Sequence, residues 1–127
     1  MARLFTVRTL PDRLAICRLP AKAPLPDWVA KEPLWSMTRT PAELTLVCPE
    51  GNVPAGIQAE RGWLPLQVVG PLPLSMTGVL SSLSEPLARA GISIFAISTF
   101  ETDIILIRET DLEKARDALG RAGHVVD

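Results

Sequence analysis

Two short runs near the C-terminal end constrain the fold more than any other feature of the sequence. ISIFAIST (92–99) and DIILIRE (103–109) are rich in β-branched and other apolar residues, and three residues separate them. Runs of this length with so short a connection are typical of an antiparallel hairpin. The C-terminal half is therefore expected to contain an antiparallel sheet.

Segments with helical spacing lie on both sides of this hairpin. The segment before it has four apolar residues at that spacing: Leu80, Leu83, Leu87 and Ala90. Gly91 is placed to end this helix, and Pro86 is expected to kink it because proline lacks a backbone N–H.

The segment after the hairpin begins with a capping-box pattern, in which Thr110 and Glu113 would satisfy backbone N–H groups. The apolar side of this second helix consists of Leu112, Ala115, Leu119 and Ala122. Gly123 is placed to end it. LPLQVVG (64–70) and the tail from His124 to Val126 add strands. From Trp63 onward we expect strand, helix, strand, strand, helix, strand.

The first half repeats this order more weakly. LAICRL (14–19) is a strand, PLPDWVA (24–30) is a short helix or turn, and a second hairpin forms around Pro41 and Ala42. The turn-rich EGNVPAG (50–56) follows, and then a strand that either belongs to this half or is shared with the second. FTVRTL (5–10) adds one more strand, and the first strands either pair within this half or swap between the two halves. The predicted fold class is α+β: two ferredoxin-like (βαββαβ) units packed side by side, with antiparallel sheets and helices on one face. The expected domains are residues 1–60 and 61–127.

Composition excludes several classes of protein. The net charge of -1 gives no field that would attract nucleic acid, and no apolar run approaches the ~20 residues needed to span a bilayer. RNA-binding sheets need paired aromatic residues on a basic face, whereas this chain has no Tyr and scattered aromatics. Trp28, Trp35 and Trp63 are expected to pack in the core or between the two halves. Cys17 and Cys48 are interpreted as free buried thiols, which indicates a cytoplasmic protein.

No catalytic motif is present. The sequence lacks a phosphate-binding loop, a dinucleotide fingerprint and a nucleophile elbow. His124 is the single histidine and is expected on the surface of the tail, where it forms no metal cluster. We therefore expect neither an enzyme nor a bound cofactor.

Two longer motifs carry a resemblance to a known family. They are WSMTRTPAELTLVCPE (35–50) and LPLSMTGVLSSLSEPLARAGISIFAISTFETDIILI (72–107). In these stretches the chain resembles ACT domains of the CASTOR type, named for cytosolic arginine sensors, and their small bacterial relatives. The resemblance implies two ACT units that bind a free amino acid at the interface between them. Sensor members have four such units, so the identity of their ligand does not carry over to this chain.

The resemblance also implies a ligand site built from three pieces of the chain. These are Ser36 and Met37; Thr77, Gly78 and Val79; and Ser98, Thr99, Phe100 and Asp103. The chemistry of these residues suits a zwitterion. A helix start at Gly78 offers unpaired N–H groups to the carboxylate, unless Ser75 or Thr77 merely caps the helix. Asp103 offers an acceptor to the ammonium, unless it is a solvated residue at the hairpin end. Phe100 either closes the pocket or lies in the core.

The sequence therefore predicts an amino-acid-binding regulatory module whose ligand lies between ACT units. Its expected partners are a free amino acid, a regulated protein and a second copy of the chain in a homodimer. The alternative is a ligand-independent module for protein interaction or oligomerisation, which would use the same edges and faces.

Overall fold

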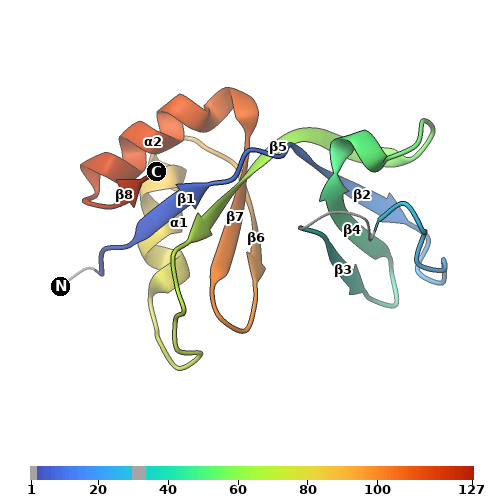
Figure 1. Cartoon of the computed structure of the whole chain (residues 1–127), viewed down its shortest axis with the longest axis horizontal. Helices are drawn as coiled ribbons and strands as arrows, with labels where there is room; N and C mark the ends of the chain where they lie inside the picture. Colours follow the sequence, from blue (N-terminus) through green and yellow to red (C-terminus); the bar gives the residue numbers. More distant parts are fainter. Residues whose placement is uncertain (1–2, 30–33) are drawn as a thin grey trace. The chain divides into compact units, whose positions relative to one another are not determined.

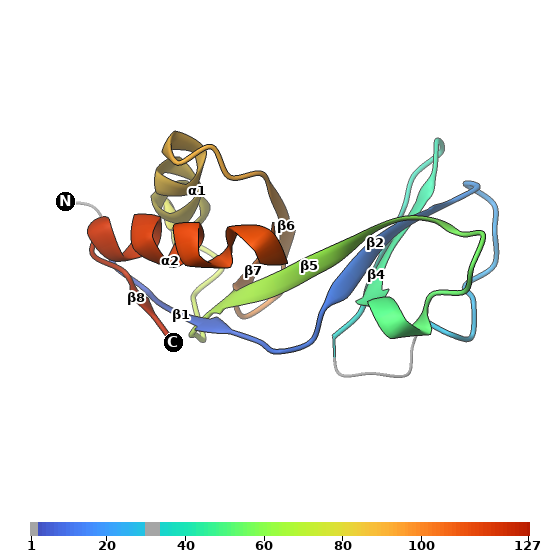
Figure 2. The ribbon, with the colours of Figure 1, turned by 90° about the horizontal axis from the view of Figure 1, so that it is seen from above.

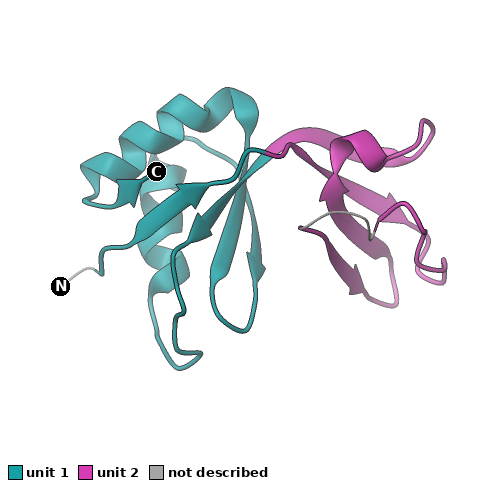
Figure 3. Cartoon of the chain, viewed as in Figure 1, with its two compact units in different colours: residues 1–11, 64–127 teal, residues 12–63 magenta. Residues whose placement is uncertain are grey.

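The structure is a computed structural model that describes residues 3–29 and 34–127. It divides into two compact units (Figure 3): unit 1 comprises residues 1–11 and 64–127, and unit 2 comprises residues 12–63. This division differs from the expected ranges 1–60 and 61–127 chiefly at the N-terminus. The first eleven residues belong with the C-terminal half.

Unit 1 contains both α-helices of the described residues (Figure 1). Its elements are β1 (Thr6–Thr9), the second half of β5 (Gln58–Val68), α1 (Val79–Arg89), β6 (Ile94–Ser98), β7 (Asp103–Arg108), a 3-10 turn η2 (Glu109–Asp111), α2 (Leu112–Arg121) and β8 (Val125–Val126). From β5 onward the predicted order of strands and helices is confirmed. α1 continues through Pro86 and ends before Gly91, whose φ of 75° is left-handed.

The sheet of unit 1 includes a strand that the sequence assigned elsewhere. β5 pairs with β7 on one side and with β1 on the other, and β1 pairs in turn with β8. β1 is antiparallel to β5, with Val7 opposite Val68, and parallel to β8. Of the two alternatives for FTVRTL (5–10), pairing within the first half is therefore wrong, and the strand joins the sheet of the other half. Val7 is 1% exposed in the core of unit 1, and burying this side chain favours the long-range pairing.

The core of unit 1 lies between this sheet and the helices, which Figure 2 shows on the same side of the sheet. α1 contributes Leu83 and Leu87, and α2 contributes Ala115 and Leu119. These four are among the eight residues that helical spacing placed on the inner faces. Leu80, predicted on the same stripe, is 39% exposed instead.

The start of α2 differs from the predicted capping box. The N-cap residue is Asp111, and no side chain caps the helix. Thr110 lies instead in the preceding 3-10 turn, where the backbone N–H of Leu112 bonds to the carbonyl of Glu109. That backbone bond tightens the entry to the helix, so the predicted exchange between Thr110 and Glu113 is wrong.

Unit 2 consists of strands in its described part. These are β2 (Leu14–Leu19), β3 (Ser36–Arg39), β4 (Leu44–Pro49) and the first half of β5, with a 3-10 turn η1 (Glu50–Asn52). Their order in the sheet is β3-β4-β2-β5. The predicted β3–β4 hairpin is confirmed, with Ser36 opposite Val47. Residues 27–29 form a turn, and the end of the predicted segment 24–30 lies outside the described residues.

The core of unit 2 gathers around β2 and β4. Leu44, Leu46 and Cys48 are fully buried there, and Trp28 packs against them. Trp63 is also buried, as predicted, whereas Trp35 is 38% exposed just before the edge strand β3. The core role expected of Trp35 is therefore wrong. Among the described residues, no helix is long and apolar enough to cross a membrane.

Cys17 and Cys48 are both free and buried, as the sequence predicted. They lie on the paired strands β2 and β4, where Ala15 is opposite Cys48 and Cys17 is opposite Leu46. A hydrogen bond between the two thiols lowers the pKa of Cys17 and raises that of Cys48, and burial raises the pKa of Cys48 further.

Both thiols should be protected in the folded protein. Because Cys17 and Cys48 are at most 1% exposed, we expect dithiobis(nitrobenzoate) to react on the order of 100-fold more slowly than with an unfolded chain. The control is the same protein in guanidinium chloride, where both thiols should react rapidly. Fast reaction of either cysteine under native conditions would contradict the packing of β2 against β4.

Candidate functional site

A cavity of about 320 Å³ in unit 1 lies beside the start of α1 and the turn of the β6–β7 hairpin. Both segments belong to the longer motif that carries the family resemblance. The volume is at the lower end of the range of small-molecule sites. Its walls therefore decide what it can bind.

One wall is the entry to α1. Gly78 is the N-cap residue, with a left-handed φ of 79°, a conformation that favours glycine. No side chain caps the helix, and its first turn contains no acidic residue. The alternative that Ser75 or Thr77 serves only as a cap is therefore wrong. The first N–H groups of α1 leave a partial positive charge at this end of the cavity.

The opposite wall is the end of the hairpin. Asp103 is half-buried and lies directly opposite Ser98 in the β6–β7 register. The Ser98 hydroxyl donates a 2.6 Å hydrogen bond to Asp103 Oδ1. Among the described residues, only Ser98 bonds to this carboxylate. The Asp103 side chain is thus oriented by one hydroxyl and keeps capacity to accept further hydrogen bonds.

The hairpin turn is fixed by its own bonds and by neighbouring segments. The Thr99 and Thr102 backbones bond at 2.8 Å, and the Thr99 hydroxyl accepts from the Thr102 N–H. Thr102 is 9% exposed and donates its hydroxyl to the Val68 carbonyl of β5 at 2.6 Å. The Leu72 N–H donates to the Glu101 carbonyl, also at 2.6 Å. These contacts hold the loop before α1 against the turn.

Six of the nine predicted site residues line this cavity. They are Gly78, Val79, Ser98, Thr99, Phe100 and Asp103. Thr77 is exposed and does not line it. Ser36 and Met37 lie on β3 of unit 2, the former half-buried and the latter 44% exposed.

Phe100 lies at the cavity with 79% of its surface exposed. The alternative that it packs in the core is therefore wrong. Its position at the tip of a tight hairpin turn explains this exposure, because the neighbouring strands run away from it into the sheet.

Sequence reasoning missed the other half of the lining. The missed residues are Leu72, Pro73, Leu74, Met76, Leu80 and Thr102. All but one of these are apolar residues from the loop and first turn around α1. The run LPL at 72–74 was a usable signal, because two leucines in a loop with no helical or strand spacing need an explanation.

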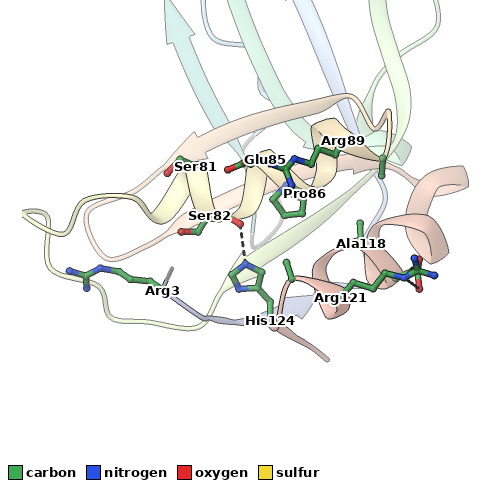
Figure 4. A pocket seen from close by; sticks show the side chains of 12 residues that line it. Arg3, Ser81, Ser82, Glu85, Pro86, Arg89, Ala118, Arg121 and His124 are labelled. Atoms are coloured by element: carbon green, nitrogen blue, oxygen red, sulfur yellow. Dashed lines mark hydrogen bonds and ion pairs between the residues drawn. The ribbon is translucent and has the colours of Figure 1, made fainter. Parts of the chain in front are cut away.

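A larger cavity of about 550 Å³ lies between α1 and α2 and contains none of the predicted residues. Two charged pairs of its lining lie within single helices, Arg89 with Glu85 and Arg121 with Asp117, and Arg3 from the N-terminal segment also lines it (Figure 4). His124 lines it too and uses both ring nitrogens: Nδ1 accepts from the Phe5 N–H at 3.1 Å, and Nε2 lies 3.0 Å from the Ser82 carbonyl. We build the candidate site at the cavity beside Gly78, because six of the predicted residues line that one.

His124 is 6% exposed, so its predicted place on the surface is wrong. The reason is that its two hydrogen bonds and its stacking on the Phe5 ring, with ring centroids 6.0 Å apart, hold it between the N-terminal segment and α1. Among the residues that the structure describes, no group of three or more His, Cys, Asp or Glu could hold a metal ion.

Comparisons with known proteins identify the family and the fold. The sequence profile of the ACT domain matches residues 58–121, and the profile of an N-terminal domain matches residues 12–56. The cytosolic arginine sensor for mTORC1 subunit 1 of Bos taurus is 35% identical over an alignment of 98 positions, and this alignment covers 68% of this chain and 30% of the sensor. The chain spans about half or less of the length of the first curated relatives that it matches.

Solved structures show the same fold. Protein Atu0741 from Agobacterium tumefaciens has a TM-score of 0.94 at 36% identity, with 99% of this chain and 94% of that chain covered. The regulatory subunit of aspartate kinase from Thermus thermophilus has a TM-score of 0.62 at 16% identity, with 95% and 99% covered. The chain therefore has an α+β ACT fold, belongs to the ACT domain family and is a relative of the CASTOR-type sensors.

Proposed function

We propose that this protein is a regulatory module that binds a free amino acid in the cavity between the α1 entry and the β6–β7 turn. One observation carries the proposal. An uncapped helix N-terminus at Gly78 and a half-buried carboxylate at Asp103 line the same small cavity. A zwitterion is the ligand class that needs both groups at once.

The two ends of the ligand use different parts of the wall. Its carboxylate accepts from the first N–H groups of α1, where the positive end of the helix dipole adds attraction. Gly78 has no side chain, so the ligand can approach this backbone closely. Its ammonium donates to Asp103, which Ser98 already orients at 2.6 Å. The Thr99 hydroxyl, on the same wall, supplies a further polar contact.

The relatives support a regulatory role without catalysis. The bovine relative is a cytosolic arginine sensor, and the Thermus thermophilus structure is the regulatory subunit of aspartate kinase. A ligand stabilises whichever conformation or dimer binds it more tightly, and a partner protein can respond to that change. The contributions of Ser36 and Met37, and the pairing of two ACT units at residues 1–60 and 61–127, stay predictions.

Asp103→Asn should abolish the stabilisation by ligand. A ligand at 100 times its dissociation constant adds about 2.7 kcal/mol to the free energy of unfolding. Each kcal/mol raises the melting temperature by roughly 2–8 °C for domains of this size range. A thermal-shift panel of free amino acids should therefore give a clear rise with the wild-type chain. The asparagine variant should show none, because it lacks the charge that pairs with the ammonium.

The matched control is Glu101→Gln. Glu101 is an exposed acidic residue of the same turn that does not line the cavity. This variant should keep the full ligand-induced shift. Equal loss in both variants would mean that the acidic turn acts through general charge, and the proposed pairing at Asp103 would be abandoned.

The second candidate is an interaction module that needs no ligand. Leu74 and Phe100 are 69% and 79% exposed, and both line the cavity, so they offer apolar surface to a partner protein. A flat amino-acid panel, measured on protein refolded after removal of any retained ligand, would favour this candidate.

A further inference from the structure

The cavity proposed above has little capacity for charge. Among the described residues that line it, Asp103 is the one ionisable side chain. Seven of the twelve lining residues are apolar: Leu72, Pro73, Leu74, Met76, Val79, Leu80 and Phe100. The lining contains neither a second carboxylate nor a cationic side chain.

The charges of the lining residues limit which amino acids the cavity can bind. The ammonium group of a bound amino acid pairs with Asp103, and its carboxylate occupies the α1 entry. A cationic side chain would need a second carboxylate, and an acidic one would need a cation. A charged side chain would find no counter-charge in this lining, and it could cover the apolar surfaces only by giving up part of its hydration. Both kinds of charged amino acid are therefore disfavoured.

The apolar rim adds a positive preference. Leu74 is 69% exposed, Phe100 is 79% exposed and Leu80 is 39% exposed. A ligand side chain that covers these surfaces removes apolar area from water on both molecules. A hydroxyl-bearing or amide side chain would cover them without that gain.

We infer that this cavity selects an amino acid with an uncharged, apolar side chain, such as leucine, isoleucine, methionine or phenylalanine. The inference rests on the proposed function, because it concerns the same cavity. The ligand class inferred for this chain therefore differs from arginine, the amino acid that gives the bovine sensor its name. Selectivity arises from the loop at residues 72–76 together with Leu80 and Phe100, whereas Asp103 and the α1 entry hold the part common to all amino acids.

Calorimetric titration of the full chain with single amino acids tests the inference. The probes are L-leucine, L-methionine, L-phenylalanine, L-alanine, L-arginine, L-lysine and L-glutamate. At least one of the first three should bind about tenfold or more tightly than alanine, since each methylene in an apolar pocket is worth about 10-fold or more. Arginine, lysine and glutamate should bind more weakly still.

A charge introduced at the rim provides the second arm. Leu74→Glu places a carboxylate at the exposed edge of the cavity, where it should not disturb folding. It should weaken leucine binding about tenfold or more and bring arginine binding to or above that of leucine. Leu4→Glu is the matched control, because Leu4 is 61% exposed and does not line the cavity. Its amino-acid preference should equal that of the wild type.

The outcomes separate this inference from the proposed function. If arginine, lysine or glutamate binds the wild-type chain most tightly and Asp103→Asn abolishes binding, the selectivity is overturned and the function stands. If no amino acid binds, both are overturned. An unchanged preference in Leu74→Glu would remove the apolar rim as the source of selectivity.

Discussion

Leu87→Ala should lower the free energy of unfolding by about 2–5 kcal/mol, the cost of deleting a large aliphatic side chain in a packed core. Leu87 is fully buried on the inner face of α1 and packs with Leu83 against the strands of unit 1. The surrounding residues come from both helices and the sheet, so they cannot close over the space without moving the backbone. Urea denaturation of the ligand-free chain, followed by circular dichroism, measures the change.

The control substitution is Leu80→Ala on the same helix. It makes the same chemical change with the same effect on helix propensity, but Leu80 is 39% exposed and lies outside the core cluster. We expect a loss of less than about 1 kcal/mol. Equal losses at the two positions would mean that α1 does not pack through the Leu83 and Leu87 face.

Local spacing explains why this part of the fold could be predicted. Leu83 and Leu87 are one helical turn apart, and the two strands of the β6–β7 hairpin are adjacent in sequence. Both signals depend on residues within one short window. The same holds for the glycines that end the helices, since Gly91 and Gly123 both have left-handed φ values.

The pairing of strands that are far apart in the sequence could not be predicted from local spacing. β1 pairs with β5 some sixty residues away and with β8 at the other end of the chain, and its sequence fits either half equally well. The same limit applies to β5, which runs from Gln58 to Val68. The sequence predicted one strand after the turn at residues 50–56 and another from Leu64, but local spacing did not show that the two are continuous.

Only part of the candidate site could be predicted from the sequence, because its other part depends on contacts between segments that are distant in the chain. Gly78 and Asp103 belong to one long motif, and the chemistry of a helix entry and a carboxylate is visible in the residues themselves. The apolar part of the cavity, including Leu74 and Leu80, depends on how the loop before α1 folds over the hairpin turn. The 2.6 Å bond from Leu72 to Glu101 that fixes this loop joins two backbone groups, which the sequence does not specify.

The burial of His124 depends on hydrogen bonds to backbone groups elsewhere in the chain. Pro86 has no N–H, so the carbonyl of Ser82 lacks the bond that a helix would normally give it. The imidazole of His124 supplies the missing bond. Its Nδ1 accepts from the Phe5 N–H, so the ring proton lies on Nε2. Nε2 then donates to the Ser82 carbonyl at 3.0 Å. His124 therefore replaces a hydrogen bond that Pro86 removes from α1.

His124→Phe should lower the free energy of unfolding by about 2–5 kcal/mol. It keeps an aromatic ring beside Phe5 but leaves the Phe5 N–H and the Ser82 carbonyl without partners, and each unsatisfied buried group costs about 1–3 kcal/mol. The bond to Ser82 can be isolated with Pro86→Ala, because alanine restores an N–H that can bond to that carbonyl. In the Pro86→Ala background, the cost of His124→Phe should fall by about 1 kcal/mol or more.

Pro73→Ala is the control for this cycle, since Pro73 lies in the loop before α1 and does not contribute a bond to Ser82. Its coupling to His124→Phe should stay within about 0.5 kcal/mol, the error of additivity for independent sites. If Pro86→Ala shows no more coupling than this, the histidine does not compensate for the proline, and its burial must be attributed to the Phe5 contact alone. A clear difference would show that the C-terminal tail stabilises the helix whose first turn lines the proposed ligand cavity.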